Sequence, residues 1–257
     1  MNLSQRRERL IARLRVPKTR AREGAVLVEG VRAVSEALDA GVEASFAVVS
    51  PRLERSKAGS ELLSRLESLE VVHTDDRDLE RVSDTERGQG VMLVCAEPAA
   101  ALEAVHTGGQ YLVLDGVQDP GNAGTLIRAA VAFGFEAVLC LDGTVDPWGP
   151  KPVRASAGMV FRVPVVRAAT PEVIEWLRES EVPLYVADAT GKDVDEHPRL
   201  ESFAIAVGNE GKGVRSLLAD EAAGRVAVRM RGGAESLNVA MAGAIIMHAL
   251  ARDGIHE

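Results

Sequence analysis

Residues 111–142, YLVLDGVQDPGNAGTLIRAAVAFGFEAVLCLD, place a strand, a loop, a helix and a second strand in immediate succession. The run 111–117 is apolar enough to be buried on both faces, which is typical of a strand in a parallel sheet. Apolar residues then recur at helical spacing over 123–134, and Gly134 is a plausible stop for that helix. The stretch therefore predicts a β–α–β unit of an α/β protein.

The same alternation continues to the end of the chain. It predicts a parallel sheet with helices on both faces. Thr170 and Ser236 are expected to cap helices, while Met241 and Met247 are expected in the core. Further strands are predicted at 135–142, 161–167, 184–189, 203–209 and 225–230, and further helices at 170–180, 214–221 and 236–252.

An Ala-, Gly- and Pro-rich stretch at 98–109 reads as a linker. It predicts two domains, a small α/β/α domain over 1–97 and a larger one over 110–257. The smaller domain has predicted strands at 25–30, 45–50, 70–74 and 90–96, and predicted helices at 31–41 and 61–68.

The composition narrows the class of protein. A chain of 257 residues with 46% apolar side chains can bury a sizeable core. No apolar run reaches the length of a membrane span, and the Arg-rich start lacks the apolar region of a secretory signal. Cys95 and Cys140 each lie alone in apolar runs, as reduced core residues of a cytosolic protein do. We therefore expect a cytoplasmic protein.

The charge is unevenly distributed. The net charge of −8 argues against a general polyanion binder. Residues 1–32, however, carry nine basic side chains against three acidic ones. Such a local patch can contact nucleic-acid phosphates, with Arg20, Arg22 and Arg32 as candidates. The alternative is an ordinary solvated helix face.

Four polar loops should meet at one edge of the larger sheet, because the carboxyl ends of parallel strands coincide there. The sequence lacks the GxGxxG pattern, the phosphate loop, the GxSxG turn and any metal-like histidine spacing, so dinucleotide, NTPase, hydrolase and metal chemistry are disfavoured. The loops are QDPGNAG (118–124), GTVDPWGPKPVRASAG (143–158), GNEGKG (208–213) and RGGAESLN (231–238).

Three of these stretches resemble the signature motifs of the SpoU-type RNA 2′-O-ribose methyltransferases of the SPOUT superfamily. They are DGVQDPGNAGTLIRAAVAFGF, AVGNEGKGV and VRMRGGAESLNVAMAGAIIMHAL, and they follow one another over 111–252. LVEGVRAVSEAL and QGVML resemble the ribosomal-protein-like RNA-binding domain that precedes the catalytic domain in many members.

The resemblance implies a Rossmann-like catalytic domain with a deep C-terminal trefoil knot, S-adenosylmethionine as methyl donor, no metal, and a homodimer. By the match, Gly208, Asn209, Val228, Met230 and Leu237 bind the cofactor. The catalytic residues would be Arg128, Asn122, Glu210, Ser236 and Asn238, and Arg154 would help to bind RNA phosphate.

The resemblance proposes that Arg128 activates the 2′-hydroxyl, but a guanidinium holds almost no free base at neutral pH. Binding the adjacent phosphate and stabilising the developing alkoxide fits its chemistry better. The separate front domain favours ribosomal RNA of the 23S type over transfer RNA. Two other hypotheses stay open: a non-catalytic RNA-binding or ribosome-assembly protein with the same fold, and an α/β enzyme using an adenylate cofactor for other chemistry.

Overall fold

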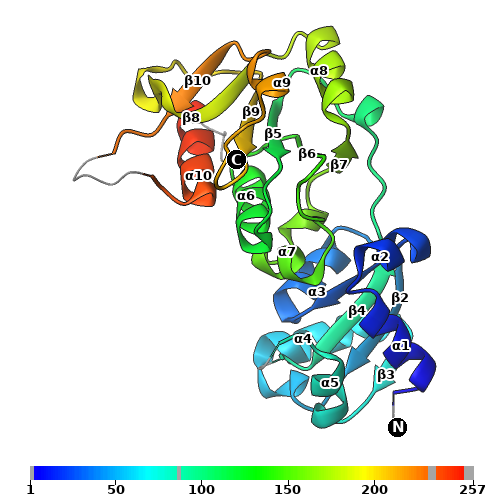
Figure 1. Cartoon of the computed structure of the whole chain (residues 1–257). Coiled ribbons are helices and arrows are strands. Elements are labelled where there is room, and N and C mark those ends of the chain that lie inside the picture. The colour runs from blue at the N-terminus through cyan, green and yellow to red at the C-terminus, as the bar shows by residue number, and fades with distance from the viewer. Residues whose placement is uncertain (1–2, 86–87, 231–235, 252–257) are drawn as a thin grey trace. The chain divides into compact units, whose positions relative to one another are not determined.

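The computed structural model describes residues 3–85, 88–230 and 236–251 (Figure 1). The chain forms two compact units. The first comprises Met1–Ala99 with Trp148–Arg162, and the second comprises Ala100–Pro147 with Val163–Glu257. Residues 148–162, which the sequence assigns to the larger domain, thus pack in the first unit. Gly158 lies so close to Ala33 that an added Cβ would come 2.8 Å from the Ala33 Cα.

The first unit is built on a four-stranded mixed sheet in the order β1-β4-β2-β3. The strand β4 runs antiparallel to both β1 and β2, while β2 and β3 are parallel. Its core is mainly aliphatic and includes Ile11, Leu14, Val48 and Val94, together with the aromatic ring of Phe46. The strands are β1 (Ala25–Glu29), β2 (Ala44–Val49), β3 (Val71–His73) and β4 (Val91–Ala96).

The helices of this unit include four that the sequence patterns do not predict. The helices α3 and α4 correspond to the predicted helices at 31–41 and 61–68, and the missed helices are α1, α2, α5 and α7. The bounds are α1 (Gln5–Arg13), α2 (Pro17–Glu23), α3 (Val31–Asp39), α4 (Lys57–Leu66), α5 (Asp76–Val82) and α7 (Pro150–Ala155), with 3-10 turns η1 (Leu53–Arg55) and η3 (Met159–Phe161).

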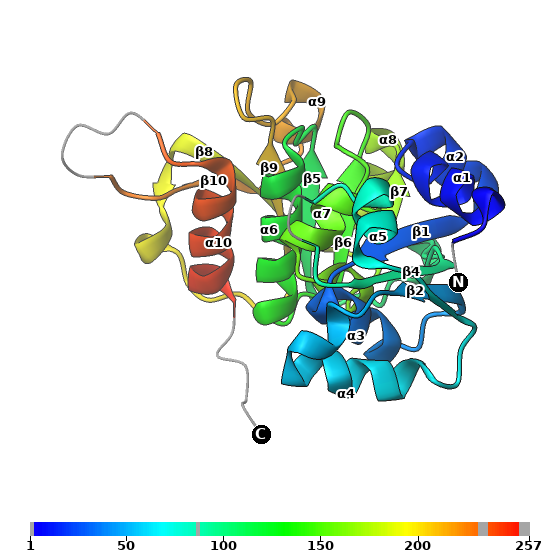
Figure 2. The same ribbon diagram turned by 90° about the horizontal axis from the view of Figure 1, so that it is seen from below.

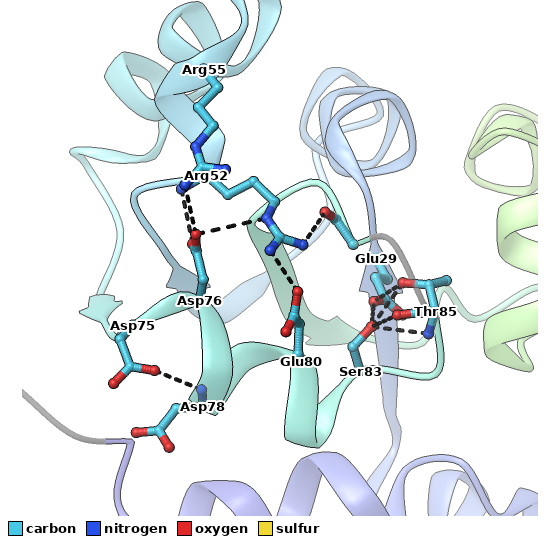
Figure 3. Close-up of polar contacts among 10 residues, drawn as sticks. Glu29, Arg52, Arg55, Asp75, Asp76, Asp78, Glu80, Ser83 and Thr85 are labelled. Carbon is cyan, nitrogen blue, oxygen red and sulfur yellow. Dashed lines mark hydrogen bonds and ion pairs between the residues drawn. The ribbon is translucent and has the colours of Figure 1, made fainter.

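Polar side chains hold the loops at one edge of this sheet (Figure 3). Arg52, just after β2, forms ion pairs with Asp76 and Glu80 of α5. The buried carboxylate of Glu29, at the end of β1, accepts hydrogen bonds from Ser83 and from the hydroxyl of Thr85 (2.8 Å). These contacts connect the loops after β1 and β2 to α5 and to the segment before β4.

The second unit is built on a six-stranded sheet in the order β10-β8-β9-β5-β6-β7. Every neighbouring pair is parallel, as the sequence predicts. The predicted strand at 161–167 is displaced, because residues 159–161 form η3 and β7 begins only at Val165. The strands are β5 (Gln110–Asp115), β6 (Ala137–Leu141), β7 (Val165–Ala168), β8 (Leu184–Asp193), β9 (Phe203–Gly208) and β10 (Gly224–Ala227).

Two helices of this unit pack side by side, as Figures 1 and 2 both show. They are α6 (Pro120–Ala132) and α10 (Val239–Leu250). A Cβ on Gly243 of α10 would lie 2.5 Å from Cδ2 of Leu126 on α6, so the small residue permits the close approach. The remaining elements are α8 (Thr170–Glu179), α9 (Ser216–Ala219), η2 (Leu102–Ala104) and η4 (Val194–Glu196).

Two predicted helix caps are wrong. The helix α10 begins after Asn238, whose side-chain oxygen accepts from the backbone of Ala240 (2.9 Å) and Met241 (3.2 Å), so Asn238 rather than Ser236 is the N-cap. The helix α8 already includes Thr170, because Glu172 closes its first turn by accepting from the Ala169 backbone (2.9 Å).

The core assignment of α10 is half right. Met247 is fully buried, but Met241 is 57% exposed and Ile245 is 40% exposed. The buried residues of α10 recur at helical spacing, which leaves positions 241 and 245 on the opposite face. Cys95 and Cys140 are buried free thiols, as predicted, and burial raises the pKa of each to about 12.

None of the helices in the described ranges is long and apolar enough to cross a membrane. The predicted trefoil knot stays a prediction, because residues 231–235, which lead into α10, lie outside the described residues.

Candidate active site

A cavity of about 520 Å³ opens beside the carboxyl ends of β9 and β10 and the middle of β8 in the second unit. This volume is that of a typical small-molecule site. The loop 209–214 after β9 forms one wall, and the start of α10 forms another. Of the residues expected at the cofactor or in catalysis, the structure places seven on its lining: Gly208, Asn209, Glu210, Val228, Met230, Ser236 and Leu237.

Three predicted catalytic residues form a hydrogen-bonded chain beside this cavity. The Asn122 side-chain nitrogen donates to Oε1 of Glu210 at 3.1 Å, and the Asn238 side-chain nitrogen donates to Oδ1 of Asn122 at 2.9 Å. Glu210 also accepts from the backbone N–H groups of Gln118 (3.2 Å) and Asp119 (3.0 Å). These hydrogen bonds connect the loop after β9 to the N-termini of α6 and α10.

The surroundings of Glu210 keep it ionised at neutral pH. Partial burial alone would raise its pKa, but the hydrogen bonds from Asn122 and from backbone N–H groups outweigh burial. The pKa of Glu210 is therefore below its usual value. The carboxylate also lies at the N-terminus of α6, where the helix dipole favours negative charge.

Two backbone segments pass close to each other at Gly208. A Cβ on Gly208 would lie 2.1 Å from the carbonyl carbon of Gly213 and 2.2 Å from the nitrogen of Val214. Asn209 and Gly213 exchange two backbone hydrogen bonds, of 3.0 and 2.9 Å, which close the loop just beyond this contact. The glycine predicted from the motif is therefore required by backbone packing.

The cavity fits the adenosine and methionine parts of S-adenosylmethionine. Val228, Leu237 and Ile246 supply apolar surface for a base, and Gly208 and Gly213 let backbone polar groups approach the ligand. The carboxylate of Glu210 lines the same cavity and suits a positively charged sulfonium. Among the described residues, no group of three His, Cys, Asp or Glu side chains is placed to hold a metal.

Asp188 and Arg225 add a charged pair to the cavity wall that the sequence analysis did not identify. Hydrogen bonds from the Thr190 backbone and hydroxyl, together with Arg225, lower the pKa of Asp188. Asp188 and Arg225 lie on neighbouring strands, β8 and β10, so only the sheet order brings them together.

The structure does not bring Arg128 into the cavity or into the hydrogen-bonded chain. Arg128 lies on α6, six residues after Asn122, which is about 9 Å along the helix axis. Its side chain is exposed and has no hydrogen bond or ion pair with any residue in the described ranges. A free guanidinium at this place is available to an anionic ligand.

The four arginines predicted to bind RNA lie in the first unit and differ in accessibility. Arg20 is only 2% exposed and donates to the Leu14 carbonyl oxygen at 2.7 Å, so its assignment to RNA binding is wrong. Arg154 is paired with Glu29 and Asp84. Arg22 is exposed beside Glu23. Arg32, at the start of α3, is exposed and has no ion pair within the described ranges.

Comparison with protein families accounts for both units. The profile of the SpoU rRNA Methylase family matches residues 109–248, more than half of the chain. The chain belongs to this family. The profile of the MRM3-like substrate binding domain matches residues 5–93.

Two relatives of this SpoU-family chain and one solved structure illustrate the similarity. The 23S rRNA (guanosine(2553)-2′-O)-methyltransferase RlmP of Bacillus subtilis is 36% identical over 93% of each chain. The 23S rRNA (uridine(2479)-2′-O)-methyltransferase of Streptomyces viridochromogenes is 30% identical over 92% of this chain and 85% of its own. The structure of the SpoU methyltransferase AviRb from Streptomyces viridochromogenes, in complex with AdoMet, is similar with a TM-score of 0.86 and 27% sequence identity. The match covers 96% of this chain and 97% of the AviRb chain.

Proposed function

We propose that this SpoU-family protein transfers a methyl group from S-adenosylmethionine to a ribose 2′-hydroxyl of 23S ribosomal RNA. The observation that carries the proposal is the chain of hydrogen bonds from Glu210 through Asn122 to Asn238, formed at the mouth of a cofactor-sized cavity. The two relatives named above both methylate ribose in 23S rRNA, at different nucleotides.

The bound cofactor would supply an activated methyl group, so the protein's task is mainly one of placement. In the transfer, the 2′-oxygen forms a bond to the methyl carbon while the carbon–sulfur bond breaks, and the hydroxyl proton is released. Gly208, Val228 and Leu237 would hold the adenosine part, and Asn209 and Met230 would complete the pocket. Glu210 would face the positive sulfur side.

Arg128 would act on the RNA side of the site. Because its guanidinium is exposed and unpaired among the described residues, it can bind a phosphate next to the accepting ribose without breaking an internal contact. A fixed positive charge there would also stabilise negative charge that develops on the 2′-oxygen. Asn122 and Asn238 would orient the ribose, and Ser236 lines the cavity close to Asn238.

The first unit would supply affinity for the RNA, because its profile match is to a substrate binding domain and Arg32 is exposed there. Ribosomal RNA is favoured over transfer RNA because a separate substrate-binding unit precedes the methylase unit. A cytoplasmic site of action agrees with this substrate.

The active form would be a homodimer that uses the exposed face of α10. Met241 and Ile245 of α10 are exposed there, in the first turns after the N-cap Asn238. Apolar side chains of this size are commonly covered in assemblies. Sedimentation should give twice the chain mass for the wild type, and Met241→Glu with Ile245→Glu should shift the protein to the monomer. A monomeric wild type at micromolar concentration would contradict the dimer.

The reaction is tested with labelled S-adenosylmethionine and two substrates, unmodified 23S rRNA and transfer RNA. The wild type should label 23S rRNA, and Arg128→Ala should lower kcat about 100-fold while leaving cofactor affinity unchanged. Arg178→Gln, which removes an exposed ion pair with Glu221 on the same unit, is the matched control. Cofactor binding without methylation of either RNA would favour the non-catalytic alternative.

A further inference from the structure

The second unit contains a buried carboxylate that the motifs do not assign. Asp115 ends β5, and its side chain is fully buried. Both of its oxygens are engaged by one residue, Arg215. The Arg215 backbone N–H donates to Oδ2 at 2.7 Å, and its Nε donates to Oδ1 at 2.6 Å. The terminal Nη2 also forms an ion pair with this carboxylate and donates to the hydroxyl of Thr170 at 2.9 Å.

Arg215 is the first residue after loop 209–214, which forms one wall of the cavity. The entry of this loop is fixed by the close backbone contact between Gly208 and Gly213. Its middle is fixed by Asn209, whose Oδ1 accepts from the backbone of Gly211 and Lys212, both at 3.1 Å. Its exit is fixed by the bonds between Arg215 and Asp115.

The strand order explains why Asp115 lies near both ends of the loop. Asp115 pairs in register with Gly208 on the neighbouring strand β9. The carboxylate therefore lies next to the entry of the loop while it binds the residue at the exit. Glu210 lies within this short span, so the position of its carboxylate at Asn122 depends on the path of the loop.

We propose that Asp115 is a positioning residue for cofactor binding and methyl transfer. Acting through Arg215, it fixes the exit of loop 209–214 and so sets the cavity wall and the place of Glu210. The part that concerns methyl transfer rests on the proposed function; the part that concerns the loop does not. Because Asp115 is buried, loss of Arg215 alone leaves a buried negative charge without its partner. This destabilises the folded protein more than removing both charges does.

The test compares Asp115→Asn, Arg215→Gln and the double variant, with Arg178→Gln as a control for loss of an exposed ion pair. Two quantities are measured: affinity for S-adenosylhomocysteine by calorimetry, and amide hydrogen exchange of residues 209–214 without ligand. We expect Arg215→Gln to weaken the affinity at least tenfold and to speed exchange in the loop. The double variant should be less impaired than Arg215→Gln in both affinity and loop exchange. The KM for RNA of each variant should stay within twofold of the wild-type value.

Three results separate the possibilities. The proposal would be overturned if the folded Asp115→Asn and Arg215→Gln proteins kept the wild-type affinity and the wild-type hydrogen exchange of the loop. It would also be overturned if the effects of the two substitutions simply added in the double variant. A wild type that binds S-adenosylhomocysteine but methylates no RNA would instead refute the proposed function, while the exchange data would still decide whether Asp115 positions the loop.

Discussion

The side-chain nitrogen of Asn238 donates to Oδ1 of Asn122 at 2.9 Å and thereby connects the first turn of α10 to the first turn of α6. Asn238 is also the N-cap of α10. The side-chain amide of Asn238 therefore has two roles. Its oxygen caps the N-terminus of α10, and its nitrogen holds Asn122 in the orientation in which Asn122 donates to Glu210.

The two roles of Asn238 can be separated by substitution. Asn238→Asp keeps an oxygen that caps α10 about as well as asparagine does, but a carboxylate cannot donate to Asn122. We expect its melting temperature to stay near that of the wild type while kcat falls at least tenfold. Asn238→Ala should lose both roles and about 1 kcal/mol of stability. Equal loss of stability in the two variants would contradict this division.

Glu210→Gln should impair transfer because it removes the negative charge expected to face the sulfonium. The pH dependence follows from the lowered pKa of Glu210. A carboxyl group whose pKa is lower in the folded than in the unfolded protein stabilises the fold at pH values above its unfolded-state pKa. This stabilisation is lost as the pH falls through the pKa of the folded state. The stability difference between wild type and Glu210→Gln should thus be constant near neutrality and shrink below about pH 4. A difference that grows on acidification would refute the assigned sign.

Gly208→Ala and Gly211→Ala form a matched pair in the same segment. The added methyl group at Gly208 meets the backbone of Gly213 and Val214 at little more than 2 Å, whereas at Gly211 the nearest atom is 3.8 Å away. Gly208→Ala should lower the melting temperature and abolish cofactor binding, and Gly211→Ala should leave both nearly unchanged. Similar behaviour of the two variants in thermal melts and calorimetry would contradict the close backbone passage.

Arg32→Gln should weaken RNA binding without changing cofactor affinity. If Arg32 contacts one phosphate, the slope of log affinity against log salt should fall by about 1. Arg65→Gln, which loses a partly exposed ion pair with Asp39 in the same unit but lies outside the basic stretch 1–32, is the control and should keep the wild-type slope. An unchanged slope in Arg32→Gln, measured by fluorescence titration, would remove Arg32 from the RNA interface.

The lining of the cavity was predictable because it depends on local patterns. Each polar loop follows a strand, and parallel strands deliver their carboxyl ends to one edge. The resemblance then named Gly208, Glu210 and Leu237, all of which line the cavity. The resemblance also named Asn122, which lies in the first turn of α6, and Asn238, which is the N-cap of α10.

What could not be predicted depends on long-range packing. Asp115 and Arg215 are 100 residues apart, and only the adjacency of β5 and β9 brings them together. Arg20 belongs to an Arg-rich stretch in which its buried side chain looks like its exposed neighbours. Ser236 was predicted as the N-cap in place of Asn238 because both residue types suit that position.

Locating the transferred methyl group shows whether this protein methylates ribose in 23S rRNA. Unmodified 23S rRNA would be incubated with the protein and S-adenosylmethionine, digested to nucleosides and fragments, and analysed by mass spectrometry. We expect one 2′-O-methylated nucleotide at a single position with the wild type and none with Arg128→Ala. Methylation on a base, or none at all by a protein that binds the cofactor, would contradict this expectation.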